Sequence, residues 1–291
     1  MEEQVKESSI LIREVETKNI MTKSTLPVGG YSVNPYVGCT HGCKYCYASF
    51  MKRFTGHTEQ WGTFLDVKRW PAIKNPWKYR GQRVVIGSVT DGYNPQEEQF
   101  GNTRRILEQL KGSGAEILIC TKSDLVVRDL ELLKTMGKVT VSWSINTLDE
   151  QFRADMDQAV SIERRLAAMK KVYDAGIRTV CFISPVFPGI TDFEAIFERV
   201  RNQCDLVWLE NLNLRGGFKK DIMDYIQEKY PDLVPLYDAI YNKKDRSYFQ
   251  MLEEKATRLA RNNNCPFVDN ELPYGRAEQG HPVIVDYFYH E

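Results

Sequence analysis

One short stretch decides how this chain is expected to fold: Gly38-Cys39-Thr40-His41-Gly42-Cys43-Lys44-Tyr45-Cys46-Tyr47. Its cysteines follow the spacing C-x3-C-x2-C. Thiolates are soft anionic ligands that suit iron–sulfur clusters. A [4Fe–4S] cube with a cysteine on every iron is saturated, so three cysteines leave one iron open to a different ligand. The stretch therefore predicts a metal centre held by Cys39, Cys43 and Cys46, with one open position.

Two other uses of clustered cysteines fit the sequence less well. A structural zinc site is tetrahedral, and the nearby candidates for a further ligand are His41, inside the loop itself, and His57. No further C-x2-C pair occurs in the chain. A disulfide framework is disfavoured because the chain has seven cysteines, an odd number, and opens on charged residues rather than on a signal peptide.

Length and composition set the outer limits. The 291 residues suit one α/β barrel or two modest domains, and 39 basic residues balance 39 acidic ones. No apolar run approaches the ~20 residues that a membrane span needs. Reduced cysteines and the absence of a targeting segment predict a cytoplasmic enzyme without membrane contact.

Short apolar runs alternate with helical patterns from about residue 84 to 212, as is typical of parallel βαβ units. Each run is nearly continuous, as in strands buried on both faces. Strands are predicted at 84–86, 117–119, 139–141, 180–183 and 206–209, and the stretch 31–36 adds a sixth. Asn102, Ser161 and the pair Thr191 and Glu194 are expected to cap helices. After residue 215 the pattern is helical at 221–229 and 246–261, followed by a proline-punctuated tail from Cys265.

Polar groups follow several predicted strands. Because the carboxyl ends of parallel strands gather the chemistry in barrels, these residues are the site candidates. They occur in the segments 87–97, 121–129 and 142–146. Hydroxyl, amide and charged groups of this kind can bind the charged and polar groups of a ligand.

The motifs resemble a known family. The cysteine spacing, with an aromatic residue before the third cysteine, resembles the signature of the radical S-adenosylmethionine (SAM) superfamily. The segments Thr90-Asp91-x-Tyr93-x-Pro95-x-Glu97, Thr121-Lys122-Ser123 and Arg128-Asp129 resemble its branch related to spore photoproduct lyase. The region 31–68 is similar to proteins called radical SAM mobile pair protein B, which are found beside a companion radical SAM protein.

The resemblance implies a fold. It is the α/β partial (β/α)6 barrel of the radical SAM type, here over residues 31–215. Residues 1–30 would form an N-terminal extension, and residues 216–291 a helical C-terminal cap packed on the barrel.

The resemblance also implies roles for particular residues. Cys39, Cys43 and Cys46 would bind a [4Fe–4S] cluster whose open iron binds SAM. The SAM contacts would be Tyr45 near the cluster and adenine, Thr90 and Asp91 near the ammonium, Lys122 near the carboxylate, Ser144 near the carboxylate or ribose, and Asn146 beside it. Ordinary roles compete for several of these: Lys122 as a surface lysine, Tyr45 in loop packing, and Ser144 and Asn146 in satisfying a turn.

The chemistry implied is reductive cleavage of SAM. An electron from the reduced cluster would release methionine and a 5′-deoxyadenosyl radical, which abstracts hydrogen from a substrate. Spore photoproduct lyase uses a further cysteine as hydrogen donor, at a position that falls near Ser88-Val89-Thr90, where this chain has none. Repair of the spore thymine dimer is therefore disfavoured. Cys120, just before Thr121-Lys122, is the candidate donor.

Two further groups bear on the substrate. Residues 44–83 combine nine basic residues with aromatic ones, a pattern that can track a nucleic-acid strand or else cover the barrel with aromatics turned inward. At the sixth strand, Glu210, Asn211, Asn213 and Arg215 are substrate-site candidates, and a Glu210–Arg215 ion pair is the competing interpretation.

The sequence leaves several functions open. The substrate expected first is a nucleic-acid base or nucleotide, followed by a peptide or protein. A non-enzymatic iron–sulfur or zinc scaffold, or an electron carrier, is the alternative from another class. The expected partners are a companion radical SAM protein and an electron donor such as flavodoxin or ferredoxin.

Overall fold

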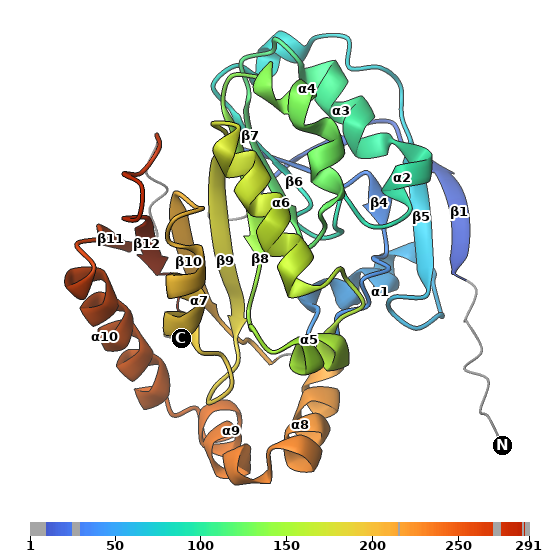
Figure 1. Ribbon diagram of the computed structural model, residues 1–291. Coiled ribbons are helices and arrows are strands. Elements are labelled where there is room, and N and C mark those ends of the chain that lie inside the picture. Colours follow the sequence, from blue (N-terminus) through green and yellow to red (C-terminus); the bar gives the residue numbers. More distant parts are fainter. Residues whose placement is uncertain (1–9, 25–29, 215, 270–274, 287, 289–291) are drawn as a thin grey trace, which may run out of the picture.

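An open, mostly parallel sheet forms the centre of the computed structural model, which describes residues 10–24, 30–214, 216–269, 275–286 and 288. Six parallel strands correspond to the six predicted ones: β3 (Tyr31–Val33), β6 (Arg83–Ile86), β7 (Glu116–Thr121), β8 (Val139–Ser144), β9 (Arg178–Val186) and β10 (Leu206–Asn211). Three more strands extend this series: β2 (Met21–Lys23), β11 (Phe267–Asp269) and β12 (Val283–Asp286). The order is β11-β12-β10-β9-β8-β7-β6-β3-β2 (Figure 1).

The two edges of this sheet are unlike each other. On one side β2 pairs antiparallel with β3. On the other, β12 pairs parallel with β10, with Val283 opposite Leu206. Among the described residues β2 and β11 do not pair, so the barrel is open, and the predicted partial barrel is confirmed. The tail after Cys265 is more regular than expected, because it supplies β11 and β12.

The stretch 31–36 is not one strand, which corrects the prediction. β3 ends at Val33, and β4 (Tyr36–Val37) belongs to a second sheet with β5 (Phe64–Arg69) and β1 (Leu11–Glu16), in the order β1-β5-β4. The break falls at Asn34-Pro35, where proline has no N–H to give to a ladder. Residues on both sides of the proposed boundaries at 30 and 215 share the main sheet, and the boundaries themselves stay predictions.

Helices cover the outer face of the sheet and its carboxyl edge. They are α1 (Lys52–Thr55), α2 (Glu97–Phe100), α3 (Asn102–Leu110), α4 (Leu130–Lys134), α5 (Glu150–Met156), α6 (Ile162–Asp174), α7 (Phe193–Val200), α8 (Phe218–Lys229), α9 (Val234–Tyr241) and α10 (Ser247–Asn262). Short 3-10 turns lie at Tyr47–Met51, Pro76–Tyr79, Leu125–Asp129 and Pro231–Leu233. No helix of the described part of the chain is long and apolar enough to cross a membrane.

Of the predicted caps, only one is confirmed. The Ser161 hydroxyl accepts from the Arg164 amide at 3.4 Å at the start of α6. The cap of α7 is Asp192, because the Thr191 hydroxyl instead bonds the Phe187 amide and the Asn146 carbonyl. Asn102 is the first residue of α3 and donates to the Lys68 carbonyl at 3.0 Å. The side chains of Thr191 and Asn102 therefore form hydrogen bonds elsewhere in the fold instead of capping a helix.

Both faces of the sheet are buried, which explains the continuous apolar runs. Ile86, Ile119 and Val207 belong to the large core shared with the outer helices. Val85, Leu118, Val180, Leu206 and Trp208 pack together in a separate cluster on the inner face. A further apolar cluster joins α8 and α9, through Ile222 and Tyr237, to Tyr45 and Cys43. The C-terminal helices therefore pack over the cysteine stretch, at the edge where β9 ends in Figure 1.

Candidate functional site

The cysteines lie in a loop of residues 38–47, the cluster loop, between β4 and the turn Tyr47–Met51. Gly38 starts it with φ +84°, and a Cβ there would lie 2.4 Å from the Phe64 carbonyl oxygen, so only glycine fits. Backbone hydrogen bonds from Gly42 to Cys39 and from Cys46 to Cys43, both 3.1 Å, fold the loop back on itself. The sequence spacing thus becomes a compact turn that presents its thiols at the barrel edge.

The cysteine thiols are largely shielded from water. Burial, with the charges of Asp91 and Cys46, raises the pKa of Cys39 to about 12. Burial also raises the pKa of Cys43 well above its ordinary value, although the Lys122 ammonium opposes this. A buried thiolate needs a cationic centre, and iron supplies one.

In the described parts of the chain, no three His, Cys, Asp or Glu side chains group tightly enough to hold a single metal ion. A cubane does not require such a group, because each thiolate binds a different iron.

Lys122 and Tyr45, both predicted SAM contacts, meet beside these thiols. Lys122 follows β7, and its Nζ lies 5.4 Å from the centroid of the Tyr45 ring. Its charge lowers the pKa of Cys46, although burial of that thiol raises it overall. Lys122 is therefore a cation at the cluster loop, placed to meet an anionic ligand group.

Asp91 is held by the protein itself. Its buried carboxylate accepts from the Lys122 amide at 2.7 Å, from the Tyr93 amide at 2.8 Å and from the Thr121 hydroxyl at 2.9 Å. His41 of the cluster loop bonds its Oδ2 at 3.0 Å. Burial works to raise the pKa of Asp91, but these partners, His41 foremost, hold it below its ordinary value. Asp91 thus fastens the cluster loop to the end of β7, and its contact with an ammonium stays a prediction.

Thr90 is buried in the turn that follows β6. Asn34 holds this turn, because its Oδ1 accepts from the Val89 and Thr90 amides at 3.0 and 3.2 Å. The Tyr47 hydroxyl donates to the Ser88 carbonyl of the same turn. The cluster loop, the start of the barrel and the β6 turn are therefore joined by hydrogen bonds.

Several buried polar atoms near this edge have no partner within the described residues. They are His41 Nδ1, Trp61 Nε1, Ser142 Oγ and Asn146 Nδ2. Native proteins rarely leave such atoms unsatisfied, and ligand sites are a common exception. Asn146 and Ser142 come from β8 and its end, while His41 belongs to the cluster loop. The donor set thus fits a polar ligand seated between the cluster loop and β8.

Comparison with known proteins decides the family. The model of the Radical SAM superfamily matches residues 33–200. The chain belongs to the radical SAM superfamily. An uncharacterized protein of Methanocaldococcus jannaschii is 34% identical over 239 residues, covering 81% of this chain and 89% of that protein. A protein of Pseudomonas phage M6 named radical SAM Nalpha-GlyT isomerase is 25% identical over 182 residues, covering 60% of this chain and 36% of the phage protein.

Solved structures give the same fold. Spore photoproduct lyase complexed with dinucleoside spore photoproduct has a TM-score of 0.55 and 16% identity, and the match covers 76% of this chain and 66% of the lyase. Radical SAM proteins bind a [4Fe–4S] cluster and SAM and generally need an electron donor, so the chain is an enzyme of SAM-dependent radical chemistry. The sequence expectations of family, fold, enzyme and cofactors are therefore confirmed, while the individual contacts stay predictions.

The radical SAM site contains residues that the sequence did not single out. The buried carboxylate of Asp157 accepts from Arg165 Nη2 at 2.7 Å, and the Tyr45 hydroxyl lies 3.4 Å from its other oxygen. Arg165 also donates to the Ser144 carbonyl at 3.2 Å. This pair fixes Tyr45 and the end of β8, but a lone Asp and Arg carry no local signal.

The substrate candidates lie near the same edge. The Ser184 hydroxyl donates to Glu210, Asn211 is buried, and Asn213 is exposed. Arg215 lies outside the described residues. Cys120 packs against the inner-face cluster, and burial, with the charges of Asp91 and Glu210, raises its pKa to about 12. Glu210 and Cys120 thus share the barrel interior.

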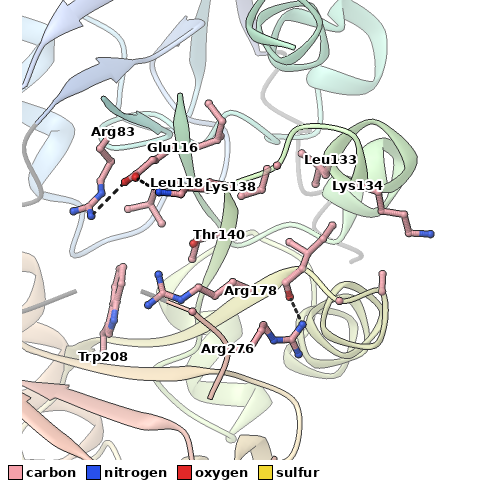
Figure 2. A pocket seen from close by; sticks show the side chains of 17 residues that line it. Arg83, Glu116, Leu118, Leu133, Lys134, Lys138, Thr140, Arg178, Trp208 and Arg276 are labelled. Carbon is pink, nitrogen blue, oxygen red and sulfur yellow. Dashed lines mark hydrogen bonds and ion pairs between the residues drawn. The ribbon is translucent and has the colours of Figure 1, made fainter. Parts of the chain in front are cut away.

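A cavity of about 510 Å³ lies at the opposite, amino-terminal ends of the strands (Figure 2). Arg83, Glu116 and Arg178, the first residues of β6, β7 and β9, line it. Figure 2 shows Arg83 and Lys138 both turned toward Glu116. Arg83 Nη2 and Lys138 Nζ lie 4.0 and 2.8 Å from the Glu116 carboxylate oxygens. This cavity is remote from the cysteines and is not the cofactor site.

Proposed function

We propose that this radical SAM enzyme abstracts a hydrogen atom from a nucleic-acid base or nucleotide. The observation that carries the SAM part is the convergence of Lys122, Tyr45 and the cysteines at one edge of the barrel. Bound together, the cluster and SAM supply a 5′-deoxyadenosyl radical. The protein's own contribution is to bind, orient and enclose the reacting groups.

Each residue has a part in that binding. Cys39, Cys43 and Cys46 would hold the cluster and would leave one iron open to SAM. Lys122 would pair with the SAM carboxylate, because a cation favours an anionic partner. Asn146 Nδ2 and Ser142 Oγ, both unpaired in the described part of the chain, offer donors to the ribose. Thr90 and Ser144 are proposed as further SAM contacts.

The cap supports chemistry in a dry site. Helices α8 and α9 pack their apolar side chains, Ile222 and Tyr237 among them, against Tyr45 and Cys43. Excluding water and oxygen prevents side reactions of a radical. The enzyme takes its electron from an external donor, for which flavodoxin or ferredoxin is our proposal, and a companion radical SAM protein is the proposed partner.

A solved structure of the same fold and the charge of this chain support a nucleic-acid substrate. The lyase of the same fold was solved with a dinucleoside, and the chain carries a basic stretch at residues 44–83. Family membership favours an enzyme over the non-enzymatic scaffold that the sequence left open.

Cys120 is the proposed hydrogen donor. Its raised pKa keeps the thiol protonated at neutral pH, and only the S–H form can give a hydrogen atom to a substrate radical. The transfer would leave a thiyl radical on Cys120, which one electron from the proposed external donor and one proton from solvent would return to the thiol. Glu210, Asn211 and Asn213 are proposed to orient the substrate above it, and Arg215 is a further candidate. Cys120→Ala is expected to keep cluster binding, measured by iron analysis. It is expected to lose product formation, measured by product chromatography.

The test of the proposed function is anaerobic SAM cleavage. The protein is reconstituted with iron and sulfide, reduced with dithionite, and assayed for 5′-deoxyadenosine with and without oligonucleotides. We expect formation of 5′-deoxyadenosine that oligonucleotides stimulate and a tryptic peptide mixture does not. Stimulation by the peptides alone would overturn the substrate class, and cleavage retained in Cys43→Ala would overturn the site.

A further inference from the structure

Three aromatic rings are exposed to solvent at the end of the cluster loop and just after it. Tyr47, Phe50 and Phe54 are 55%, 39% and 74% exposed, and they lie on the turn Tyr47–Met51 and on α1. Phe50 and Phe54 meet edge to face, with ring centroids 6.2 Å apart. Large apolar groups gathered on a surface commonly mark an interaction site.

Other aromatics of the same basic stretch behave differently. Phe64, Trp70 and Tyr79 are buried in the cores. For these rings, the sequence alternative of aromatics turned inward is confirmed. It fails for Tyr47, Phe50 and Phe54, whose rings are exposed to solvent.

The surface around these rings is basic. Lys44, Lys52 and Arg53 fall within residues 44–54, which contain no Asp or Glu. The nearest acidic residues in the chain, Glu59 and Asp66, both bond His57, at 2.8 and 3.1 Å. Within the segment 44–54, therefore, the aromatic residues alternate with cations and no carboxylate intervenes.

The position ties this surface to the reaction site. Tyr47 follows Cys46 directly, and its hydroxyl bonds the turn after β6. Lys44 Nζ lies 5.5 Å from the centroid of the Tyr225 ring on α8, at the cap. Figure 1 shows α1 in the same lower part of the molecule as α5 and α8. A ligand lying on these rings would thus reach the barrel edge where the cluster loop sits.

We propose that Tyr47, Phe50 and Phe54 form a stacking surface for a single-stranded nucleic acid, with Lys44 and Arg53 contacting its phosphates. We call these five residues the α1 surface. Unpaired bases stack on aromatic rings whatever their sequence, and cations beside the rings follow the backbone. This inference rests on the proposed function, which it narrows to a single strand docked beside the cluster.

The test measures binding of the reconstituted protein to fluorescein-labelled oligonucleotides of about 12 nucleotides. Single-stranded DNA and RNA of one mixed sequence are compared by fluorescence anisotropy. The double variant Phe50→Ala/Phe54→Ala is expected to weaken Kd about tenfold or more, because two stacking partners are lost. Arg53→Ala is expected to lower the slope of log Kd against log salt by about 0.7. The DNA and RNA arms decide which strand is preferred.

Trp77→Ala is the matched control. Trp77 is 59% exposed in the same basic stretch, but it precedes β6 and so lies at the opposite end of that strand. The Trp77→Ala variant should leave the Kd for oligonucleotides and the rate of SAM cleavage unchanged. Iron content and circular dichroism check that each variant is folded.

The outcomes separate the two proposals. Equal Kd for the double variant and the wild type would overturn the α1 surface while leaving a nucleic-acid substrate standing. Absence of wild-type binding to either strand would overturn both the surface and that substrate class. Formation of 5′-deoxyadenosine, assayed in the same preparation, reports on SAM cleavage independently.

Discussion

Lys122 shows how one side chain links the barrel to the cofactor. Its ammonium faces the Tyr45 ring and the Cys43 and Cys46 thiols. We predict that Lys122→Met weakens SAM binding roughly tenfold or more, because a hydrogen bond to a charged group is lost. Equilibrium dialysis with labelled SAM measures the change. Lys134→Met, which removes a lysine paired with Glu131 on α4, is the control, and equal affinity in both variants would contradict the assignment.

Trp61 is placed to tune the cluster. Burial raises the pKa of Cys46, and a side-chain hydrogen bond from Trp61 partly opposes this effect. The buried Trp61 Nε1 has no other partner in the described part of the chain. Gly62 and Gly42 bring the two segments together, since a Cβ on Gly62 would lie 2.8 Å from Gly42 Cα.

Hydrogen bonds to cluster sulfurs favour the reduced state. Trp61→Phe should therefore lower the midpoint potential, by an amount on the order of tens of millivolts. A redox titration followed by electron paramagnetic resonance measures it. Trp70→Phe is the control. It removes an indole N–H that donates to the Gln109 side chain at 3.3 Å, so the midpoint potential of the cluster should not change. An unchanged potential in Trp61→Phe would remove Trp61 from this role.

At this scale the sequence predicts candidate ligands but not the residues that position them. The cysteines and Lys122 were predictable because spacing and position after a strand are local properties. Trp61, Asp157 and Arg165 gained their roles only when distant segments met. Asp91 was expected at an ammonium, yet the fold surrounds it with protein donors.

Among the elements, α6 is fastened to the site by the buried ion pair between Arg165 and Asp157. Removing one partner of such a pair leaves an uncompensated charge and costs about 3 kcal/mol or more. Asp157→Ala is therefore expected to lower the free energy of unfolding by that amount, measured by urea titration. Removal of Glu163, an exposed residue of the same helix that pairs with Arg199, should change it little. A loss of equal size in both variants would contradict the role of the buried pair.

The same pair sets a pH dependence. Burial works to raise the pKa of Asp157, but Arg165 and Lys122 hold it below its ordinary value of 3.8. A lowered folded-state pKa stabilises the protein fully above the unfolded value, and this stability is lost as pH falls through the folded value. Asp157→Asn should therefore lose less stability than the wild type below about pH 4. A matching acid profile for both proteins would contradict this.

Element prediction succeeded where patterns were local. The strands from 84 to 209 were foreseen because each is a buried apolar run. The stretch 31–36 was misjudged because Pro35 interrupts pairing and sends the chain into another sheet. Thr191 and Asn102 failed as caps because their side chains met partners far along the chain.

For the whole molecule, the C-terminal strands complete the sheet. β12 pairs with β10, and Val285 packs with Trp208 on the inner face. A chain that ends at residue 264 would expose the edge of β10 and this apolar face, and open edges template aggregation. We predict aggregated material on size-exclusion chromatography. A monomer with an unchanged urea midpoint would show that these strands are dispensable.

The alternation of strands and helices predicted parallel βαβ units, and the resemblance to the radical SAM family predicted that they form a partial barrel. The contribution of the tail was not predictable, since β11 and β12 are short and widely separated in sequence. The placement of α8 and α9 over the cluster loop likewise depends on contacts that no local pattern encodes.

The most direct test of the central claim, a three-cysteine cluster with an open iron that binds SAM, is electron paramagnetic resonance of the reduced, reconstituted protein with and without SAM. The wild type should give a [4Fe–4S]+ signal whose g values shift when SAM is added, and Cys43→Ser should lose that signal. A wild-type spectrum that does not respond to SAM would contradict the account.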